Sequence, residues 1–282
     1  MKLAVTIAGE AALPSAFVVW RGFEKSISKA AGLGYHGVEL ALKSKADVDK
    51  SDLNRWLHKS GLEVSAISTG QVFADMGLYC TCPDAEKRDE IVDVFCGLID
   101  VAKDFGGLIN VGRARGFVAE GQSVLQAETL FIETFERILE EAARCGVTVI
   151  LEPVNRYEIN FINNLDEGAQ LLNKIKHGNA GLMPDVFHMN IEDDLIGESL
   201  IRNAQHVKYL HFADSNRLAP GRGHLDFDEV FKALRQMRFD GWASVEILPK
   251  PDADTAAWEA VEFLLPKIAN HNAFMLKDRG VL

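Results

Sequence analysis

Eight short apolar runs recur along this chain, and longer helical patterns separate them. The runs cover residues 3–7, 37–42, 63–68, 108–112, 147–151, 180–183, 207–211 and 243–247. Each run has about the length of one β-strand, and most are flanked by glycine. The runs at 108–112 and 147–151 are almost continuously apolar, as strands buried on both faces are. This alternation predicts an α/β fold, namely a single (β/α)₈ TIM barrel.

The stretches between the runs have the apolar period of amphipathic helices. Residues 85–105 and 128–145 both place apolar side chains three and four positions apart, with charged residues opposite. Ser123 can N-cap the second of these helices, and Gly106 and Gly146 stand where helix C-terminal glycines belong. Each run is therefore expected to lead into a packed helix.

Composition restricts the class of protein. The 282 residues are 48% hydrophobic, which supports a large core, and no linker or composition break divides them, so we expect one domain over residues 1–282. A net charge of −11 disfavours a nucleic-acid partner. The four cysteines form no C-x-x-C pair, which favours a reduced, cytoplasmic protein. The apolar N-terminal run is too short for a signal peptide, and no run is long enough to cross a membrane.

Four side chains that bind metals stand at the ends of four consecutive predicted strands. They are Glu152, Asp185, His211 and Glu246, separated by about one strand and helix each. The C-terminal ends of parallel strands converge at the mouth of a barrel. Three carboxylates and one imidazole make a hard, mostly oxygen site, which suits Mn²⁺ or Mg²⁺ better than a structural zinc.

Each of these residues also has an ordinary interpretation when it is taken alone. Glu152 can pair with Arg156, Asp185 can cap a turn after proline, and His211 can be a hydrogen-bonded strand histidine. Four such residues at the same end of four strands are hard to explain without a metal ion. The pattern therefore predicts a metal centre at the barrel mouth.

Further polar residues lie in the loops that follow the strands, at 112–122, 155–164, 188–194 and 213–226. His188 and Arg217 are candidates for contacts with a substrate oxygen; the alternatives are that His188 orients a metal ligand and that Arg217 is a solvated cation. Arg113 and Arg115 can bind a carboxylate or phosphate, or belong to a solvated loop.

Three segments carry a resemblance to a known family. They are residues 151–158 (LEPVNRYE), 185–192 (DVFHMNIE) and 211–217 (HFADSNR), and residues 34–40 (GYHGVEL) add to them. The sequence resembles the D-tagatose 3-epimerase-like sugar epimerases, which belong to the xylose-isomerase-like TIM barrels, often labelled sugar phosphate isomerase/epimerase. The resemblance extends over essentially the whole chain.

The resemblance implies a role for each matching residue. Glu152, Asp185, His211 and Glu246 would bind one divalent ion, and Glu152 and Glu246 would also serve as the acid/base pair. Glu158, His188 and Arg217 would contact the substrate. Epimerisation beside a ketone needs a Lewis acid for the developing enediolate and two carboxylates that exchange a proton on opposite faces. The implied ion is Mn²⁺ first, with Mg²⁺, Co²⁺ or Zn²⁺ also fitting such a site.

The expected substrate is a small sugar or sugar acid. Arg113 and Arg115 carry more positive charge than a neutral ketose requires, and the nearest resemblance is to epimerases of keto sugar acids such as 5-keto-L-gluconate. We therefore expect an isomerase that epimerises a keto sugar acid or a ketose. Relatives of this kind form dimers or tetramers, and the predicted terminal helix at 253–274 offers surface for such a homo-oligomer.

Four other functions compete with this one. An aldose–ketose isomerase that shifts a hydride uses two metals, more carboxylates and a lysine, whereas an inosose-type dehydratase would use much the same residues. A DNA-repair endonuclease of the same superfamily would need three zinc ions, more histidines and a basic groove. A barrel that binds sugars without turnover is disfavoured by the full set of acid/base residues.

Overall fold

Eight parallel strands form the centre of the molecule. The computed structural model describes residues 1–175 and 177–280. The strands are β1 (Lys2–Ala8), β3 (Gly37–Ala41), β4 (Glu63–Ser68), β5 (Leu108–Val111), β6 (Thr148–Leu151), β7 (Ala180–Leu182), β8 (Tyr209–Phe212) and β9 (Trp242–Val245). They pair in the order β7-β6-β5-β4-β3-β1-β9-β8. Parallel bridges between Leu182 and Val207 and between Asp185 and His211 bring β7 to β8, so the expected (β/α)₈ barrel is confirmed.

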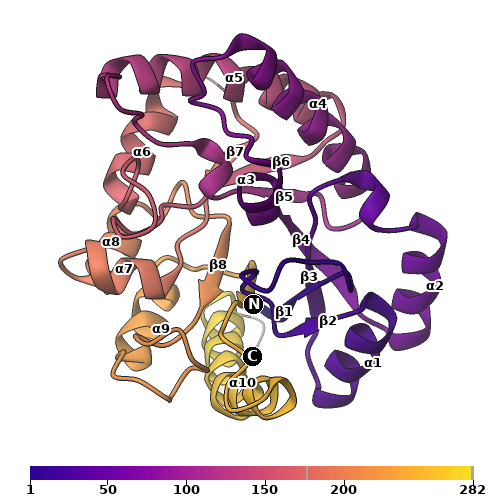
Figure 1. Ribbon diagram of the computed structural model, residues 1–282. Helices are drawn as coiled ribbons and strands as arrows, with labels where there is room; N and C mark the ends of the chain where they lie inside the picture. Colours follow the sequence, from indigo (N-terminus) through magenta and orange to yellow (C-terminus); the bar gives the residue numbers. More distant parts are fainter. Residues whose placement is uncertain (176, 281–282) are drawn as a thin grey trace.

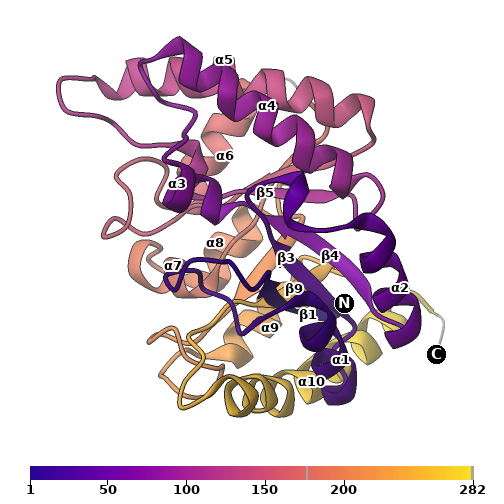
Figure 2. The same ribbon diagram turned by 45° about the vertical axis from the view of Figure 1, so that its right-hand side comes forward.

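Helices surround these strands on the outside (Figures 1 and 2). They are α1 (Phe23–Leu33), α2 (Lys50–Ser60), α3 (Gly70–Met76), α4 (Ala85–Ala102), α5 (Val124–Arg144), α6 (Leu165–Lys174), α7 (Val186–Glu192), α8 (Ile196–Arg202), α9 (Phe227–Gln236) and α10 (Ala253–Asp278). Short 3₁₀ turns, η1 (Lys45–Asp47) and η2 (Arg113–Arg115), follow β3 and β5. One large apolar core joins the outer faces of the strands to the inner faces of the helices.

Local sequence signals account for several helix ends. The hydroxyl of Ser123 accepts a hydrogen bond from the Gln126 N–H, and the Gln126 side chain accepts one from the Ser123 N–H, so α5 begins with a capping box. Gly106 and Gly146 have φ of 81° and 68° after α4 and α5. These positive values favour glycine at helix ends, as the sequence predicts.

Two segments differ from the expectation. Residues 188–194 were expected to form a loop, but most of them belong to α7, because the Asp185 side chain caps that helix through the Phe187 N–H at 2.9 Å. A two-residue strand, β2 (Trp20–Arg21), pairs with β1 after a long connection that crosses the barrel mouth. Neither apolar periodicity nor turn residues mark so short a strand.

The inside of the barrel is tightly filled below the mouth. Ala66, Ile150, Met183 and Tyr209 pack there as a separate buried layer. The four cysteines are free thiols, and burial raises the pKa of Cys80 to about 12. In residues 1–175 and 177–280, no helix combines the length and apolar character needed to span a lipid bilayer.

Candidate metal centre and substrate cavity

The four predicted metal ligands converge at one end of the barrel. Glu152 directly follows β6, Asp185 lies between β7 and α7, His211 is in β8 and Glu246 directly follows β9. One ligand atom from each residue lies within 4.8 Å of the corresponding atoms of the other three. The four side chains that the sequence pattern predicted to be ligands therefore lie together. They do so because each one lies at or just beyond the C-terminal end of a parallel strand.

His211 presents one ring nitrogen to this cluster and the other to the barrel interior. Its Nε2 lies 2.9 Å from a carboxylate oxygen of Glu39, and its Nδ1 lies 3.3 Å from Glu152 and 3.5 Å from Glu246. Burial alone would lower the pKa of His211, but the charges of Glu39 and Glu246 outweigh it and raise the pKa well above its ordinary value. The imidazole is thus held by negative charge on both sides.

Glu152 is buried, and residues in and just after the neighbouring strand β5 contact its carboxylate. The Asn110 amide in β5 donates a hydrogen bond of 3.1 Å to its Oε2. The backbone of Gly112 passes so close that an added Cβ would lie 2.8 Å from the same oxygen. Glycine at this position therefore leaves room for the carboxylate.

Asp185 uses its two oxygens for different purposes. Oδ1 caps α7, while Oδ2 faces the cluster and pairs with the Arg217 guanidinium. Burial raises the pKa of Asp185 to about 6, against the opposing charges of Arg217 and His211. The turn-capping interpretation and the ligand interpretation of this residue are therefore compatible, because one carboxylate can do both.

Arg217 joins Asp185 to Glu246. Its guanidinium pairs with both carboxylates and lies between two aromatic rings, 4.9 Å from the centroid of Phe17 and 4.8 Å from that of Phe187. Burial would raise the pKa of Glu246, but the charges of His211 and Arg217 lower it to about 2. The expected alternative, a solvated loop cation, is wrong for Arg217, which is only 4% exposed.

The cluster has the properties of a site for a divalent ion. Glu152 Oε1 and His211 Nδ1 are buried atoms without a hydrogen-bond partner among the described residues, although a buried polar atom normally has one. Three carboxylates and one imidazole supply the oxygen-rich donor set that Mn²⁺ and Mg²⁺ accept. The residues present therefore fit a metal ion.

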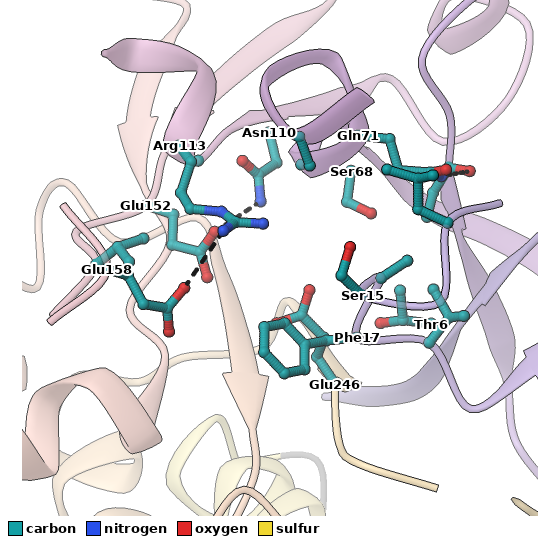
Figure 3. Close-up of a pocket in the computed structure, with 18 of the residues that line it drawn as sticks. Thr6, Ser15, Phe17, Ser68, Gln71, Asn110, Arg113, Glu152, Glu158 and Glu246 are labelled. Carbon is teal, nitrogen blue, oxygen red and sulfur yellow. Dashed lines mark hydrogen bonds and ion pairs between the residues drawn. The ribbon is translucent and has the colours of Figure 1, made fainter. Parts of the chain in front are cut away.

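The cluster opens into a cavity with polar walls (Figure 3). Glu152, Glu158, His188, Arg217 and Glu246 line it on the side of the later strands. The remaining polar wall comes from the first half of the chain and consists of Thr6, Ser15, Ser68, Gln71, Asn110 and Arg113. Apolar side chains, among them Phe17, and two glycines complete the lining. The cavity therefore offers many hydrogen-bonding groups to a polyhydroxylated molecule.

His188 and Glu158, two predicted substrate contacts, share one anchor. The Asn155 amide donates hydrogen bonds to His188 Nδ1 at 2.8 Å and to Glu158 at 3.2 Å. Burial lowers the pKa of His188 well below its ordinary value, so the ring is neutral and its Nε2–H is a donor. Burial raises the pKa of Glu158. Asn155 therefore orients both side chains at the cavity wall.

Arg113 lines the cavity, and its guanidinium makes few contacts with the described residues. Its guanidinium lies 4.0 Å from Glu158 and 5.8 Å from the ring centroid of Phe73. Figure 3 shows the side chain beside Glu152 and Glu158, and its side chain is 27% exposed. This placement suits a residue that binds an anionic or hydroxylated part of a ligand.

Arg115 lies outside the cavity. It is fully buried, and its guanidinium donates hydrogen bonds to the backbone carbonyls of Gly112, Glu152, Phe161 and Ile162 at 2.7–3.1 Å. Burial lowers its pKa to about 9, which leaves it charged at neutral pH. The expectation that Arg115 binds a substrate anion, and the alternative of a solvated loop, both fail for this reason. Arg115 instead ties the β5 and β6 connections together.

Several residues that line or support the site were not predicted from the sequence. They are Glu39, Asn110, Asn155, Phe17, Ser15, Ser68 and Gln71. Glu39 and Asn110 were detectable as polar residues inside otherwise apolar runs. The others lie in loops, at a strand end or, for Gln71, in the short helix α3, where polar residues are common and carry no signal of their own.

Comparisons with known proteins agree with this arrangement. A family model described as "Xylose isomerase-like TIM barrel" matches residues 27–267. An L-ribulose 3-epimerase of Methylomonas sp. (strain DH-1) is 29% identical over 264 residues, which cover 86% of this chain and 91% of that protein. A D-psicose 3-epimerase of Ruminiclostridium cellulolyticum is 35% identical over 115 residues, which cover 41% of this chain and only 39% of that protein.

The fold is shared with solved structures. The apo 3-keto-D-glucoside 4-epimerase of E. coli superposes with a TM-score of 0.78 at 21% identity, covering 97% of this chain and 99% of that one. At that identity the likeness shows the fold.

Proposed function

The chain belongs to the xylose isomerase-like TIM barrel family, and from that membership we propose that it is a divalent-metal-dependent epimerase of a ketose or keto sugar acid. The observation that carries the proposal is the convergence of Glu152, Asp185, His211 and Glu246 within 4.8 Å at the barrel mouth. The relatives named as 3-epimerases support the reaction class.

The four converging residues would hold one divalent ion. Mn²⁺ is the proposed ion, with Mg²⁺, Co²⁺ or Zn²⁺ as other ions that this donor set accepts. When bound, the ion supplies Lewis-acid polarisation of a substrate carbonyl and a neighbouring hydroxyl. The carboxylates of Glu152 and Glu246 stay fixed by their contacts with Asn110 and Arg217.

Glu152 and Glu246 are the proposed acid/base pair. One carboxylate takes the proton from the carbon beside the ketone, and the C–H electron pair becomes the double bond of an enediolate. The other carboxylate returns a proton to the opposite face of the same carbon, which inverts its configuration. Two carboxylates that follow separate strands, β6 and β9, can approach a substrate carbon from different sides (Figure 3).

Glu158, His188 and Arg217 are the proposed substrate-binding residues. Neutral His188 offers an Nε2–H to a substrate oxygen, and Arg217 places positive charge beside Asp185 and Glu246. Hydrogen-bond donors held in place before the reaction stabilise negative charge as it develops on oxygen. Glu158 is positioned by Asn155 to accept hydrogen bonds from substrate hydroxyls.

Arg113 supports a keto sugar acid as substrate. Its only ionic contact among the described residues is the one with Glu158 at 4.0 Å, and the bidentate shape of a guanidinium matches a carboxylate. We therefore propose that the substrate carries a carboxylate beyond the reacting carbons, and that a neutral ketose binds more weakly.

Solvent deuterium uptake tests the reaction. Metal-reconstituted protein is incubated in D₂O with ketohexoses, ketopentoses and keto sugar acids, and the products are followed by NMR, with Glu246→Gln as the control. A new epimer with deuterium at the carbon beside the ketone, lost in the variant, is the expected result. An isomer formed without label favours hydride transfer, and a dehydrated product favours the dehydratase.

Arg113→Gln tests the substrate charge. We expect the KM for an acidic substrate to rise about tenfold or more, while the KM for a neutral ketose changes little, because only the carboxylate loses a charged partner. The KM values come from the same NMR assay. Equal changes for acidic and neutral substrates would contradict the proposed carboxylate contact.

We also propose that the protein is a homo-oligomer, a dimer or tetramer. On α10, Trp258 is 51% exposed and Phe274 45% exposed, which leaves apolar surface for a second copy. Light scattering during size-exclusion chromatography measures the mass, and a monomer of 31.1 kDa would contradict the proposal.

A further inference from the structure

A buried carboxylate stands directly behind the histidine of the metal centre. We propose that Glu39 is a positioning residue that fixes His211 with Nδ1 toward the carboxylate ligands and thereby increases affinity for the divalent ion. The inference rests on the proposed function, because that function includes the metal site. Glu39 itself does not line the cavity and therefore has no contact with the substrate.

The contact between the two side chains is close and shielded from water. Both Glu39 oxygens lie near His211 Nε2, at 3.1 and 2.9 Å, and both residues are 0% exposed. Glu39 enters from β3, where it pairs in register with Thr6 of β1 and points into the barrel. His211 therefore receives this partner from the opposite half of the chain.

The hydrogen bond decides which ring nitrogen can bind a metal. A carboxylate is an acceptor only, so Nε2 carries the hydrogen and donates it to Glu39. When an ion takes the place of the Nδ1 proton, the lone pair of the ring is available on Nδ1, the atom that lies 3.3 Å from Glu152 and 3.5 Å from Glu246. Donation to a carboxylate also makes the imidazole a stronger ligand.

Glu39 is held in turn by neighbours that leave its contact with His211 intact. The hydroxyl groups of Tyr209 and Thr6 donate to its Oε2 at 3.2 and 3.4 Å, and Tyr209 bonds to Ser65 at 2.6 Å. A buried carboxylate without such partners would be strongly unfavourable. These contacts fix the orientation of Glu39, and through it that of the imidazole.

Metal binding by Glu39→Gln tests the proposal without an activity assay. The variant keeps the shape of the side chain but removes its charge. Metal-free protein is titrated with MnCl₂ by calorimetry, and the visible absorption of the Co²⁺-loaded protein reports the ligand geometry. We expect affinity for Mn²⁺ to fall about 10- to 100-fold, with a changed Co²⁺ spectrum. Ser65→Ala, which removes a hydroxyl farther along the same chain of hydrogen bonds, should bind Mn²⁺ as the wild type does.

The possible outcomes separate this inference from the proposed function. A folded Glu39→Gln protein that binds Mn²⁺ within twofold of the wild type, with the same Co²⁺ spectrum, would overturn the role of Glu39 alone. A wild-type protein that binds no divalent ion would overturn the metal centre and the inference with it. If Glu39→Gln does not fold, Glu39→Asp and Tyr209→Phe decide: weakened Mn²⁺ binding supports the proposal, and unchanged binding in both overturns it.

Discussion

At the scale of single residues, Arg113 and Arg115 differ in what surrounds them although only one residue separates them. Arg115→Ala would remove the donors of four backbone carbonyls and leave a void in the interior. We expect a loss of about 3 kcal/mol or more in the free energy of unfolding. Arg113→Ala should change this free energy by less than about 1 kcal/mol, because its contacts are few and partly exposed. Urea unfolding of both variants measures the difference, and equal losses would contradict the assignment.

Gly112 provides a second test at this scale. In Gly112→Ala, the new Cβ would lie 2.8 Å from Glu152 Oε2 and 3.4 Å from Asn110 Oδ1, so the carboxylate must shift. We expect affinity for Mn²⁺ to fall about tenfold or more, since ligand orientation governs metal affinity. Gly32→Ala in α1, where an added Cβ meets open space, is the matched control. Calorimetric titration of both variants gives the affinities, and a Gly112→Ala affinity equal to that of the control would show that Glu152 tolerates the methyl group.

A site residue can be predicted from the sequence when its charge conflicts with an apolar position. Glu152, Asp185 and Glu246 are charged residues next to apolar strands, and that conflict indicates a shared ion. The buried role of Arg115 could not be distinguished from the cavity-lining role of Arg113 by sequence. Both residues occupy the same polar segment, and only the fold determines which side chain turns inward. The role of Asn155 could not be predicted from the sequence either, because it depends on a contact with His188, 33 residues away along the chain.

At the scale of elements, the junction of α7 and α8 contains a pH-sensitive contact. Asp193 ends α7 and accepts a hydrogen bond from Ser199 of α8 at 2.5 Å, and burial raises its pKa to about 6. The folded state therefore holds the proton more tightly than the unfolded state, whose pKa is near 3.8. The contribution of this group to stability is complete below about pH 4 and is lost as the pH rises through 6.

Asp193→Asn should remove this dependence. We expect the variant to be more stable than the wild type above pH 6, and the difference in unfolding free energy to shrink toward pH 4. Asparagine retains an oxygen that can accept from Ser199, so the hydrogen bond remains. Denaturant unfolding of metal-free protein between pH 4 and 8 gives the difference, and a value that does not change with pH would contradict the assignment to Asp193.

Periodicity predicts long elements better than short ones. The helix expected at 85–105 is α4 (Ala85–Ala102), and that expected at 128–145 lies within α5 except for its last residue. Both bury a broad apolar stripe that the sequence displays. The seven-residue helix α7 carries no such stripe, and it forms because Asp185 caps it and its neighbours pack around it.

At the scale of the whole molecule, the proposed metal site connects four strands. An ion that binds only the folded protein at 100 times its Kd stabilises it by about 2.7 kcal/mol. For a chain of this size we expect the Tm of metal-free protein to rise by about 5 °C on addition of Mn²⁺. Asp185→Asn, which can still cap α7 but lacks the charge, should show little of this rise in differential scanning calorimetry. The same rise in both proteins would place the ion elsewhere.

The two halves of the chain also contribute different residues to the candidate site. The proposed metal ligands and acid/base residues lie in or directly after β6 to β9. The wall formed by Thr6, Ser15, Ser68, Gln71, Asn110 and Arg113 comes from β1, β4, β5 and the connections that follow them. Glu39 crosses that boundary as the support of His211. If the proposed function holds, substitutions in this wall are expected to change which sugars are accepted, while the proposed acid/base residues stay unchanged. Directed evolution toward new sugars should accordingly randomise Ser15, Ser68, Gln71 and Arg113. Glu39, Asn110, Gly112 and Arg115, which hold the site or the fold, should stay constant.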